Sequence, residues 1–161
     1  MISLLIALHV LAAILLIGPV TVATSAFPAQ MMKAANGDAA AFGATKTLHR
    51  ISNTYGYLSA IVPVIGVAIF LVGISNFGTQ GQYHASILLA IIAWIILLFV
   101  IVPRQKSVLA ALEKKAGAGA DTDAADAAKA STDLAKDKKQ LSMFSGIFAL
   151  LWIVTAILMF I

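Results

Sequence analysis

Four long, uncharged stretches of apolar residues constrain this chain more than any other feature of its sequence. Each has roughly the 20 residues that an α-helix needs to cross the hydrocarbon core of a bilayer, and none contains Lys, Arg, Asp or Glu. Because a charged side chain is costly at the bilayer centre, this pattern predicts transmembrane helices. The predicted spans are residues 2–22, 57–74, 84–103 and 141–161.

The composition agrees with this prediction and excludes several classes of chemistry. Of the 161 residues, 61% are hydrophobic and 11% are charged, whereas a soluble domain has about 25% charged residues. The chain has no cysteine, which excludes thiol catalysis, iron–sulfur clusters and zinc–thiolate sites. No basic residue precedes the first apolar stretch and no small-residue cleavage site follows it, so we expect a retained helix and not a signal peptide.

The distribution of charge predicts the orientation of the spans. All eleven Lys and Arg residues lie in the connections 23–56 and 104–140, and the connection 75–83 is uncharged. By the positive-inside rule the two charged connections are cytoplasmic, so both termini face outside, and we expect the plasma membrane of a bacterium. The expected anchors at the cytoplasmic surface are Lys46, Arg50 and Arg104. The net charge of +4 favours contact with anionic lipids; no nucleic-acid partner is expected, since no aromatic residues interleave with the basic ones.

The predicted fold class is all-α. Backbone polar groups in lipid must be satisfied within the protein, so the spans are helices, and short connections favour antiparallel neighbours. We therefore expect a single membrane domain, residues 1–161, whose four helices form an up-down-up-down bundle.

The two charged connections carry helical patterns of their own. Residues 104–140 predict a helical hairpin that extends the third and fourth helices into the cytoplasm, interrupted by "GAGADTD", where Asp121 or Thr122 caps a new helix. This hairpin is either a solvated spacer or a docking surface for a soluble partner or a neighbouring subunit. In residues 23–56 we expect a turn at Asn36-Gly37, an N-cap at Asp38 and a helix lying in the membrane interface.

Prolines, small residues and tryptophans mark expected packing features. Proline inside a helix produces a kink, and freed carbonyls can alternatively line a small-solute site. Small residues, including Ser142 and Gly146, favour close helix contacts, and tryptophans at mid-span favour packing anchors. The bulky third span suits a lipid-facing surface. The principal packing and kink positions are Gly18, Pro19, Pro63, Gly66, Gly73, Trp94 and Trp152.

His9 is an ionisable residue within the first apolar stretch, "LHVLAAILLIGP". Intramembrane ionisable residues are functional candidates, and two interpretations are open. The ring either bonds a neighbouring helix as a neutral imidazole, with Ser59, Thr155 or carbonyls freed by Pro63 as partners, or it ligates haem iron or copper. No second ligand is expected at its depth, because the other candidates fall near the bilayer edges: His49, His84, Met31, Met32, Met143 and Met159.

The motif "LHVLAAILLIGPV", followed by a basic loop and three more spans, resembles a family of small bacterial integral membrane proteins. More distantly, "LHVLAAIxxxG" is similar to the first helix of copper-resistance D-type proteins and of haem-binding, four-helix protoporphyrinogen oxidases. This resemblance implies haem b as a cofactor held through His9 alone. The tryptophan that those proteins have before the glycine is replaced by Leu16-Ile17-Gly18, and their further charged and histidine positions have no match, so catalysis is not implied.

The Ala-rich segment is similar in style to actinobacterial proteins, among which small four-helix chains are accessory subunits of the cytochrome bcc–aa3 respiratory supercomplex. The sequence has no phosphate-cradling glycine loop, nucleophile elbow, HExxH or carboxylate pair, so an enzyme is not expected. We therefore expect a non-catalytic accessory or assembly subunit of a larger membrane complex, without a cofactor. The alternatives are a haem- or copper-handling protein that uses His9, and a small transporter or lipid-interacting protein.

Overall fold

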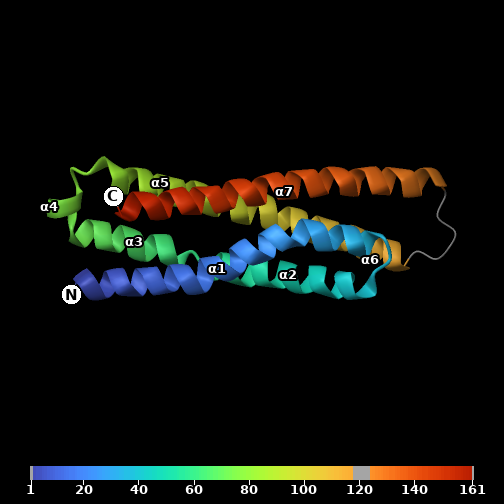
Figure 1. The fold of residues 1–161 in the computed structure, drawn as a ribbon, viewed down its shortest axis with the longest axis horizontal. Coiled ribbons are helices and arrows are strands. Elements are labelled where there is room, and N and C mark those ends of the chain that lie inside the picture. The colour runs from blue at the N-terminus through green and yellow to red at the C-terminus, as the bar shows by residue number, and fades with distance from the viewer. Residues whose placement is uncertain (1, 118–123, 161) are drawn as a thin grey trace.

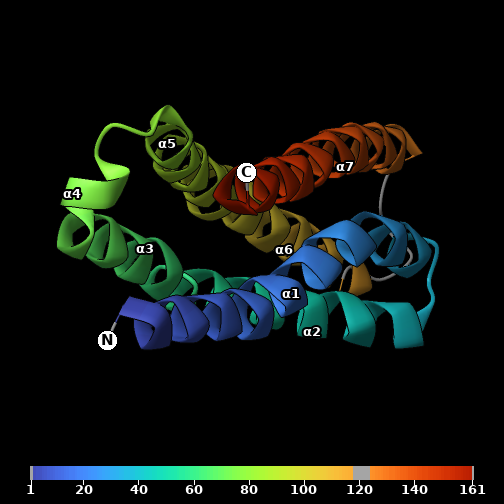
Figure 2. The same ribbon diagram turned by 60° about the vertical axis from the view of Figure 1, so that its left-hand side comes forward.

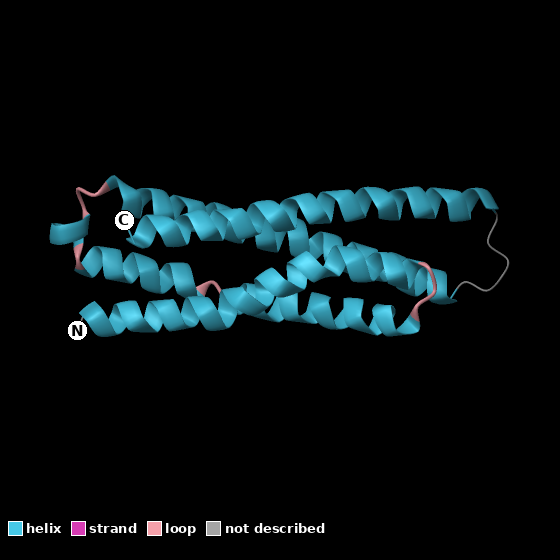
Figure 3. Cartoon of the chain, in the orientation of Figure 1, coloured by secondary structure: helices cyan, strands magenta, loops and turns pink. Residues whose placement is uncertain are grey.

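The computed structural model describes residues 2–117 and 124–160, and within these ranges every element is a helix. Figure 3 shows loops only at the connections between helices. Four helical stretches in the described residues are long and apolar enough to cross a membrane, so the chain is an all-α, four-helix membrane bundle, as the sequence predicts. The elements are α1 (Ile2–Ala35), α2 (Ala39–Leu58), α3 (Ile61–Val72), α4 (Ile74–Phe77), α5 (Gly81–Ile95), the π-helix η1 (Ile96–Ile101), α6 (Val102–Gly117) and α7 (Ala124–Phe160).

The helices run along the long axis of the molecule in alternating directions (Figure 1). Both termini lie at one end, together with α4, whereas the α1–α2 turn lies at the opposite end. Figure 2 shows α1, α2 and α3 on one side of the bundle, with α5 and α7 facing them. We call residues 2–17, 61–95 and 149–160 the terminal half, and residues 20–58, 97–117 and 124–148 the basic half, because the latter contains all the Lys and Arg residues.

The connection between the first two spans is a helical hairpin. As predicted, the chain turns at Gly37, whose φ is 93°, and Asp38 caps α2 by accepting a hydrogen bond from the Ala41 N–H at 3.0 Å. The interfacial helix predicted for residues 23–56 is wrong, because α1 continues to Ala35 and α2 packs back along it. Small residues on α2 are buried within the bundle and permit close helix packing: Ala41, Thr45, Ser52 and Gly56.

Pro63 interrupts the second span, but the break lies upstream of the proline. The Pro63 ring is incompatible with a helical carbonyl four residues earlier, which belongs to Ser59. Helix α2 ends at Leu58 and α3 begins at Ile61, and the Ser59 carbonyl accepts from the Val62 N–H at 3.0 Å. In contrast, α1 continues through Pro19 and through the buried Pro28, with a change of direction near its middle (Figure 1).

The third span is lipid-facing only on part of its surface, where Leu88, Ile95 and Phe99 are exposed. In its most apolar window 39% of the residues are buried, against 17% in each of the other three spans. Its π-helix η1 places the adjacent residues Leu97 and Leu98 both in the interior, where both side chains lie against Gly56. The third span thus approaches α2 closely at this point.

The predicted hairpin between the third and fourth spans is present as α6 and the start of α7. The caps predicted at Asp121 and Thr122 lie outside the described residues. At the end of α6, Lys115 Nζ donates to the Ala35 carbonyl at 2.7 Å, so a cation satisfies the C-terminus of α1. The α6–α7 hairpin is therefore tied to the α1–α2 hairpin.

The main hydrophobic core lies largely in the basic half. Because α1, α2, α6 and α7 all continue past the apolar stretches, they form a second length of four-helix bundle beyond the predicted spans (Figure 1). Large residues fill the core of the basic half, both beyond the predicted spans (Phe27, Met31, Val108, Leu112 and Leu134) and in the adjoining parts of the spans (Val20, Leu97, Ile101, Leu141 and Phe148).

Candidate functional site

His9 lies on the inward stripe of α1. Its side chain is 8% exposed, and the buried residues that follow it recur at helical spacing: Ile17, Val20, Thr24, Phe27 and Met31. Residues three and four positions apart share one face of a helix. The face of α1 that packs into the core of the basic half therefore also contains His9, which points into the interior of the terminal half.

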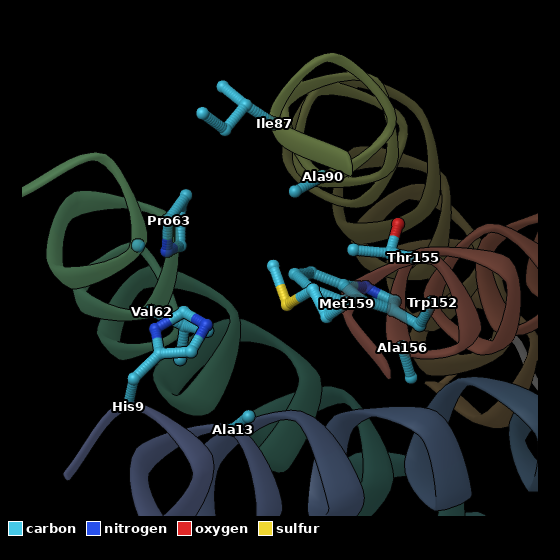
Figure 4. Close-up of a pocket in the computed structure, with 11 residues that line it drawn as sticks. His9, Ala13, Val62, Pro63, Ile87, Ala90, Trp152, Thr155, Ala156 and Met159 are labelled. Carbon is cyan, nitrogen blue, oxygen red and sulfur yellow. The ribbon is translucent and has the colours of Figure 1, made fainter. Parts of the chain in front are cut away.

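A pocket of about 80 Å³ adjoins the imidazole in the terminal half. Figure 4 shows side chains from all four spans pointing into it, with α1 below, α3 and α5 on two sides and α7 opposite α3. The pocket is mostly apolar and contains no Lys, Arg, Asp or Glu. Its lining residues are His9, Ala13, Val62, Pro63, Gly66, Ile87, Ala90, Trp152, Thr155, Ala156 and Met159.

Two buried polar atoms on this lining have no hydrogen-bond partner: His9 Nδ1 and Trp152 Nε1. The hydroxyl partners predicted for His9 are engaged locally, since Ser59 Oγ donates to the Gly56 carbonyl at 2.7 Å and Thr155 Oγ1 to the Leu151 carbonyl at 2.8 Å. The α3 backbone at Val62 lies beside the ring instead. The unpartnered atoms come from helices α1 and α7, on different sides of the pocket (Figure 4).

Gly66 permits the approach of the His9 ring to α3. A Cβ atom at this position would lie 3.0 Å from His9 Cε1, which is closer than an ordinary van der Waals contact. The small residue predicted to pack between helices therefore receives the imidazole specifically. Ser142 and Gly146 do not form the close helix contact that was expected of them. Ser142 is exposed, and a Cβ at Gly146 would meet nothing within 4 Å.

Met159 lies at the depth of His9, contrary to the sequence analysis. Both residues line the same pocket, and the Met159 sulfur points into it (Figure 4). The physical reason is an axial offset: α1 begins farther out along the long axis than α7 ends (Figure 1). The depth of each residue therefore cannot be counted from its own terminus alone.

The residues present do not fit a haem. Sites for drug-sized ligands have volumes of about 300–1,000 Å³, and the pocket of about 80 Å³ is too small for a porphyrin between the helices. For copper, the lining offers two donors that suit the metal, the His9 imidazole and the Met159 thioether. In the described residues, no group of three His, Cys, Asp or Glu side chains is placed to hold a metal ion.

The other two histidines lie in separate environments. His49 Nδ1 donates to Gln105 Oε1 at 3.4 Å, at the junction of α2 and α6. His84 packs edge-on against Phe70, with ring centroids 4.9 Å apart, and its Nδ1 lies 3.2 Å from the Gln80 carbonyl. The three histidines are thus spread along the bundle, which agrees with the depths expected from the sequence.

The two tryptophans differ in their hydrogen bonding. Trp94 Nε1 donates to the Gly56 carbonyl at 3.2 Å, which links the third span to α2. Trp152 packs against Phe148, with centroids 6.3 Å apart, and its N–H remains free in the pocket. The pairing of Trp94 with Gly56 was missed, because nothing in the sequence marks a backbone carbonyl as an acceptor.

The remaining predicted positions have local roles. Gly18 is exposed and a Cβ there would meet nothing within 4 Å, so it makes no close helix contact. Gly73 ends α3 beside the Phe77 ring, and not at a contact between spans. Among the predicted anchors, Lys46 pairs with Glu113 at 3.0 Å and Arg104 lies over the Phe144 ring; Arg50 is exposed on α2.

Comparisons with known proteins identify no relative. No protein-family description, no curated protein and no solved structure matches this chain.

Proposed function

We propose that this chain is a non-catalytic accessory or assembly subunit of a larger membrane complex in the bacterial plasma membrane. The observation that carries the proposal is the packed basic half. A flexible spacer between spans needs no core, yet α1, α2, α6 and α7 continue past the apolar stretches and bury large residues such as Phe27, Met31 and Leu112. A rigid helical surface held at a fixed height above the membrane suits docking to a partner.

The surface of this half presents charges of both signs. Lys106 and Lys114 are exposed on α6, and the paired Lys46 and Glu113 are more than half exposed. Mixed charge on a rigid surface favours specific orientation of a partner more than it favours affinity. The best candidate for the complex is the cytochrome bcc–aa3 respiratory supercomplex, which rests on the resemblance of the sequence alone.

The test is purification from native membranes in mild detergent, followed by mass spectrometry and an optical spectrum. We expect a fixed stoichiometry with the subunits of one complex. Reversing the charge of the exposed α6 lysines (Lys106→Glu with Lys114→Glu) is expected to reduce co-purification. The matched control is Thr79→Glu, at the opposite end of the molecule, which should not reduce it. Recovery of the wild-type chain as a free monomer contradicts the proposal.

The same proposal places both termini outside the cell and the basic half in the cytoplasm. Since the chain has no cysteine, single cysteines report this directly. A membrane-impermeant maleimide should label Thr79→Cys in intact cells and Lys114→Cys only after permeabilisation. The reverse pattern overturns the orientation.

A further inference from the structure

We propose that the pocket beside His9 binds the carbonyl oxygen of a neutral molecule dissolved in the bilayer. Two buried polar atoms without partners, His9 Nδ1 and Trp152 Nε1, lie on the lining of this one pocket. Leaving a buried donor unpaired costs about 1–3 kcal/mol, and in hydrocarbon no solvent offsets the loss. A complex in which the ligand pairs these atoms is therefore more stable than the free protein.

With the His9 proton on Nδ1, the hydrogen-bonding chemistry of the lining selects an acceptor. The indole N–H of Trp152 can only donate, and His9 Nδ1 donates in one of the two neutral tautomers. A carbonyl oxygen has two lone pairs and can accept from both groups at once. Because the two groups come from α7 and α1 and line the same pocket (Figure 4), a carbonyl oxygen inside it accepts from one or both of them.

The absence of charge on the lining selects a neutral ligand. None of the residues lining the pocket is Lys, Arg, Asp or Glu, so an ionised ligand would be desolvated without a counter-charge, which is strongly unfavourable. Most of the lining is apolar, from Ala13, Val62, Pro63, Ile87 and Ala90. The ligand is therefore a lipophilic molecule with an isolated polar atom.

The size of the pocket means that only part of the ligand enters it. About 80 Å³ holds a carbonyl group and its neighbouring atoms, and the rest extends between α3 and α5, which make little mutual contact. On the outer side, the Phe70–His84 contact joins these helices, one turn from Gly66 and Ile87. We place the entry of the ligand on the lipid side of these two helices.

Two kinds of membrane molecule supply such a carbonyl: the ring ketone of a quinone and the ester of a glycerolipid. The test uses the full-length protein in nanodiscs of ether-linked phospholipid, which has no ester carbonyl. One arm adds a decyl-substituted benzoquinone, the second adds a diacylglycerol, and the control adds the dialkyl glycerol ether. Saturable binding in the first arm identifies a quinone, and in the second a glycerolipid ester; either supports the proposal.

The two indole N–H resonances report the site in ¹⁵N-labelled protein. We expect the Trp152 indole signal to shift and saturate on addition of the carbonyl compound. The Trp94 signal should stay fixed, because this N–H is already bonded to the Gly56 carbonyl. The dialkyl ether should shift neither signal.

Variants separate hydrogen bonding from packing, with the retained compound measured by equilibrium dialysis. Loss of one hydrogen bond in His9→Ala or Trp152→Phe is expected to raise Kd about five- to tenfold, and Trp94→Phe should leave Kd unchanged. Gly66→Ala displaces the imidazole and should also weaken binding, whereas Gly146→Ala, with open space at its Cβ, should not.

Three outcomes overturn the proposal. The first is that neither carbonyl compound gives a saturable shift of the Trp152 signal, as expected if the pocket holds only water. The second is that the Trp152 and Trp94 signals shift equally. The third is that Trp152→Phe and Trp94→Phe bind the carbonyl compound with equal affinity. Trp152→Phe retains an aromatic ring, so it separates loss of the N–H from loss of the fold.

Discussion

The two halves of this molecule bury different kinds of residue. In the terminal half the buried residues are mostly small or polar: His9, Ile17, Val62, Ser86, Ala90, Ala93 and Thr155. In the basic half they include many large apolar side chains, such as Phe27, Met31, Leu97, Ile101, Val108, Leu112 and Phe148. One chain thus uses two kinds of interior along the same four helices.

The difference reflects in part the solvent around each half, since Phe27, Met31, Val108 and Leu112 lie beyond the predicted spans, whereas Leu97, Ile101 and Phe148 lie within them. In lipid no hydrophobic force drives helices together, so small residues and polar contacts hold them, and the large side chains face outward, as Leu71, Val72 and Leu88 do. Where the bundle continues into water, burial of large apolar side chains provides the stabilisation. A pocket persists in the terminal half because small side chains fill less of the space between helices.

The largest effect is expected from truncating a core aromatic in the basic half. Phe27→Ala removes a side chain that is 0% exposed and should lower the free energy of unfolding by about 3–5 kcal/mol. Reversible unfolding in mixed micelles, followed by circular dichroism, measures it. The matched control is Phe99→Ala, where the ring is 72% exposed and its loss should cost little. Equal losses would mean that burial of Phe27 does not stabilise the basic half.

A smaller effect is expected from a polar contact between helices. Ser145 Oγ donates to the Thr24 carbonyl at 2.9 Å, and the bond joins α7 to α1 near the junction of the halves. Ser145→Ala should lower the free energy of unfolding by about 0.6 kcal/mol, the average for interhelical bonds in a membrane protein. Ser142→Ala, one turn away on the exposed face, should leave it unchanged in the same assay.

The smallest effect is expected from the Lys46–Glu113 ion pair on the surface of the basic half. Both side chains are more than half exposed, so a double-mutant cycle with Lys46→Ala and Glu113→Ala should give a coupling of about 0.2–1 kcal/mol. Salt should weaken it, since exposed charges are screened. A coupling that is insensitive to salt would mean that lipid or a partner shields this region from water.

Local sequence signals predicted much of the fold. The four spans follow from uncharged apolar length, the turn at Gly37 from Asn-Gly, and the cap from Asp38; each depends on a few adjacent residues. The interfacial helix in residues 23–56 was wrong because packing of α2 along α1 depends on small residues of both helices. The sequence did not show which bulky side chains of the third span face lipid and which face the interior, because this depends on its neighbours, and for Leu97 and Leu98 on Gly56.

The candidate site was predicted only in part. His9 stood out because an imidazole is rare in an apolar stretch, and Trp152 because it falls at mid-span. That they share a pocket with Met159 depends on the axial offset and rotation of α1 relative to α7, which no local pattern encodes. Gly66 was recognised as a small packing residue, but that it faces the His9 ring followed only from the assembled bundle.

By itself the sequence determined that this chain enters a membrane as four helices, because the free energy of transferring a segment into lipid is largely a sum over its own residues. Only the tertiary structure decided which side chains meet. Contacts between helices depend on their relative depth, rotation and separation, which arise from all four helices packing together. The unpaired nitrogens of His9 and Trp152 came to line one pocket in this way.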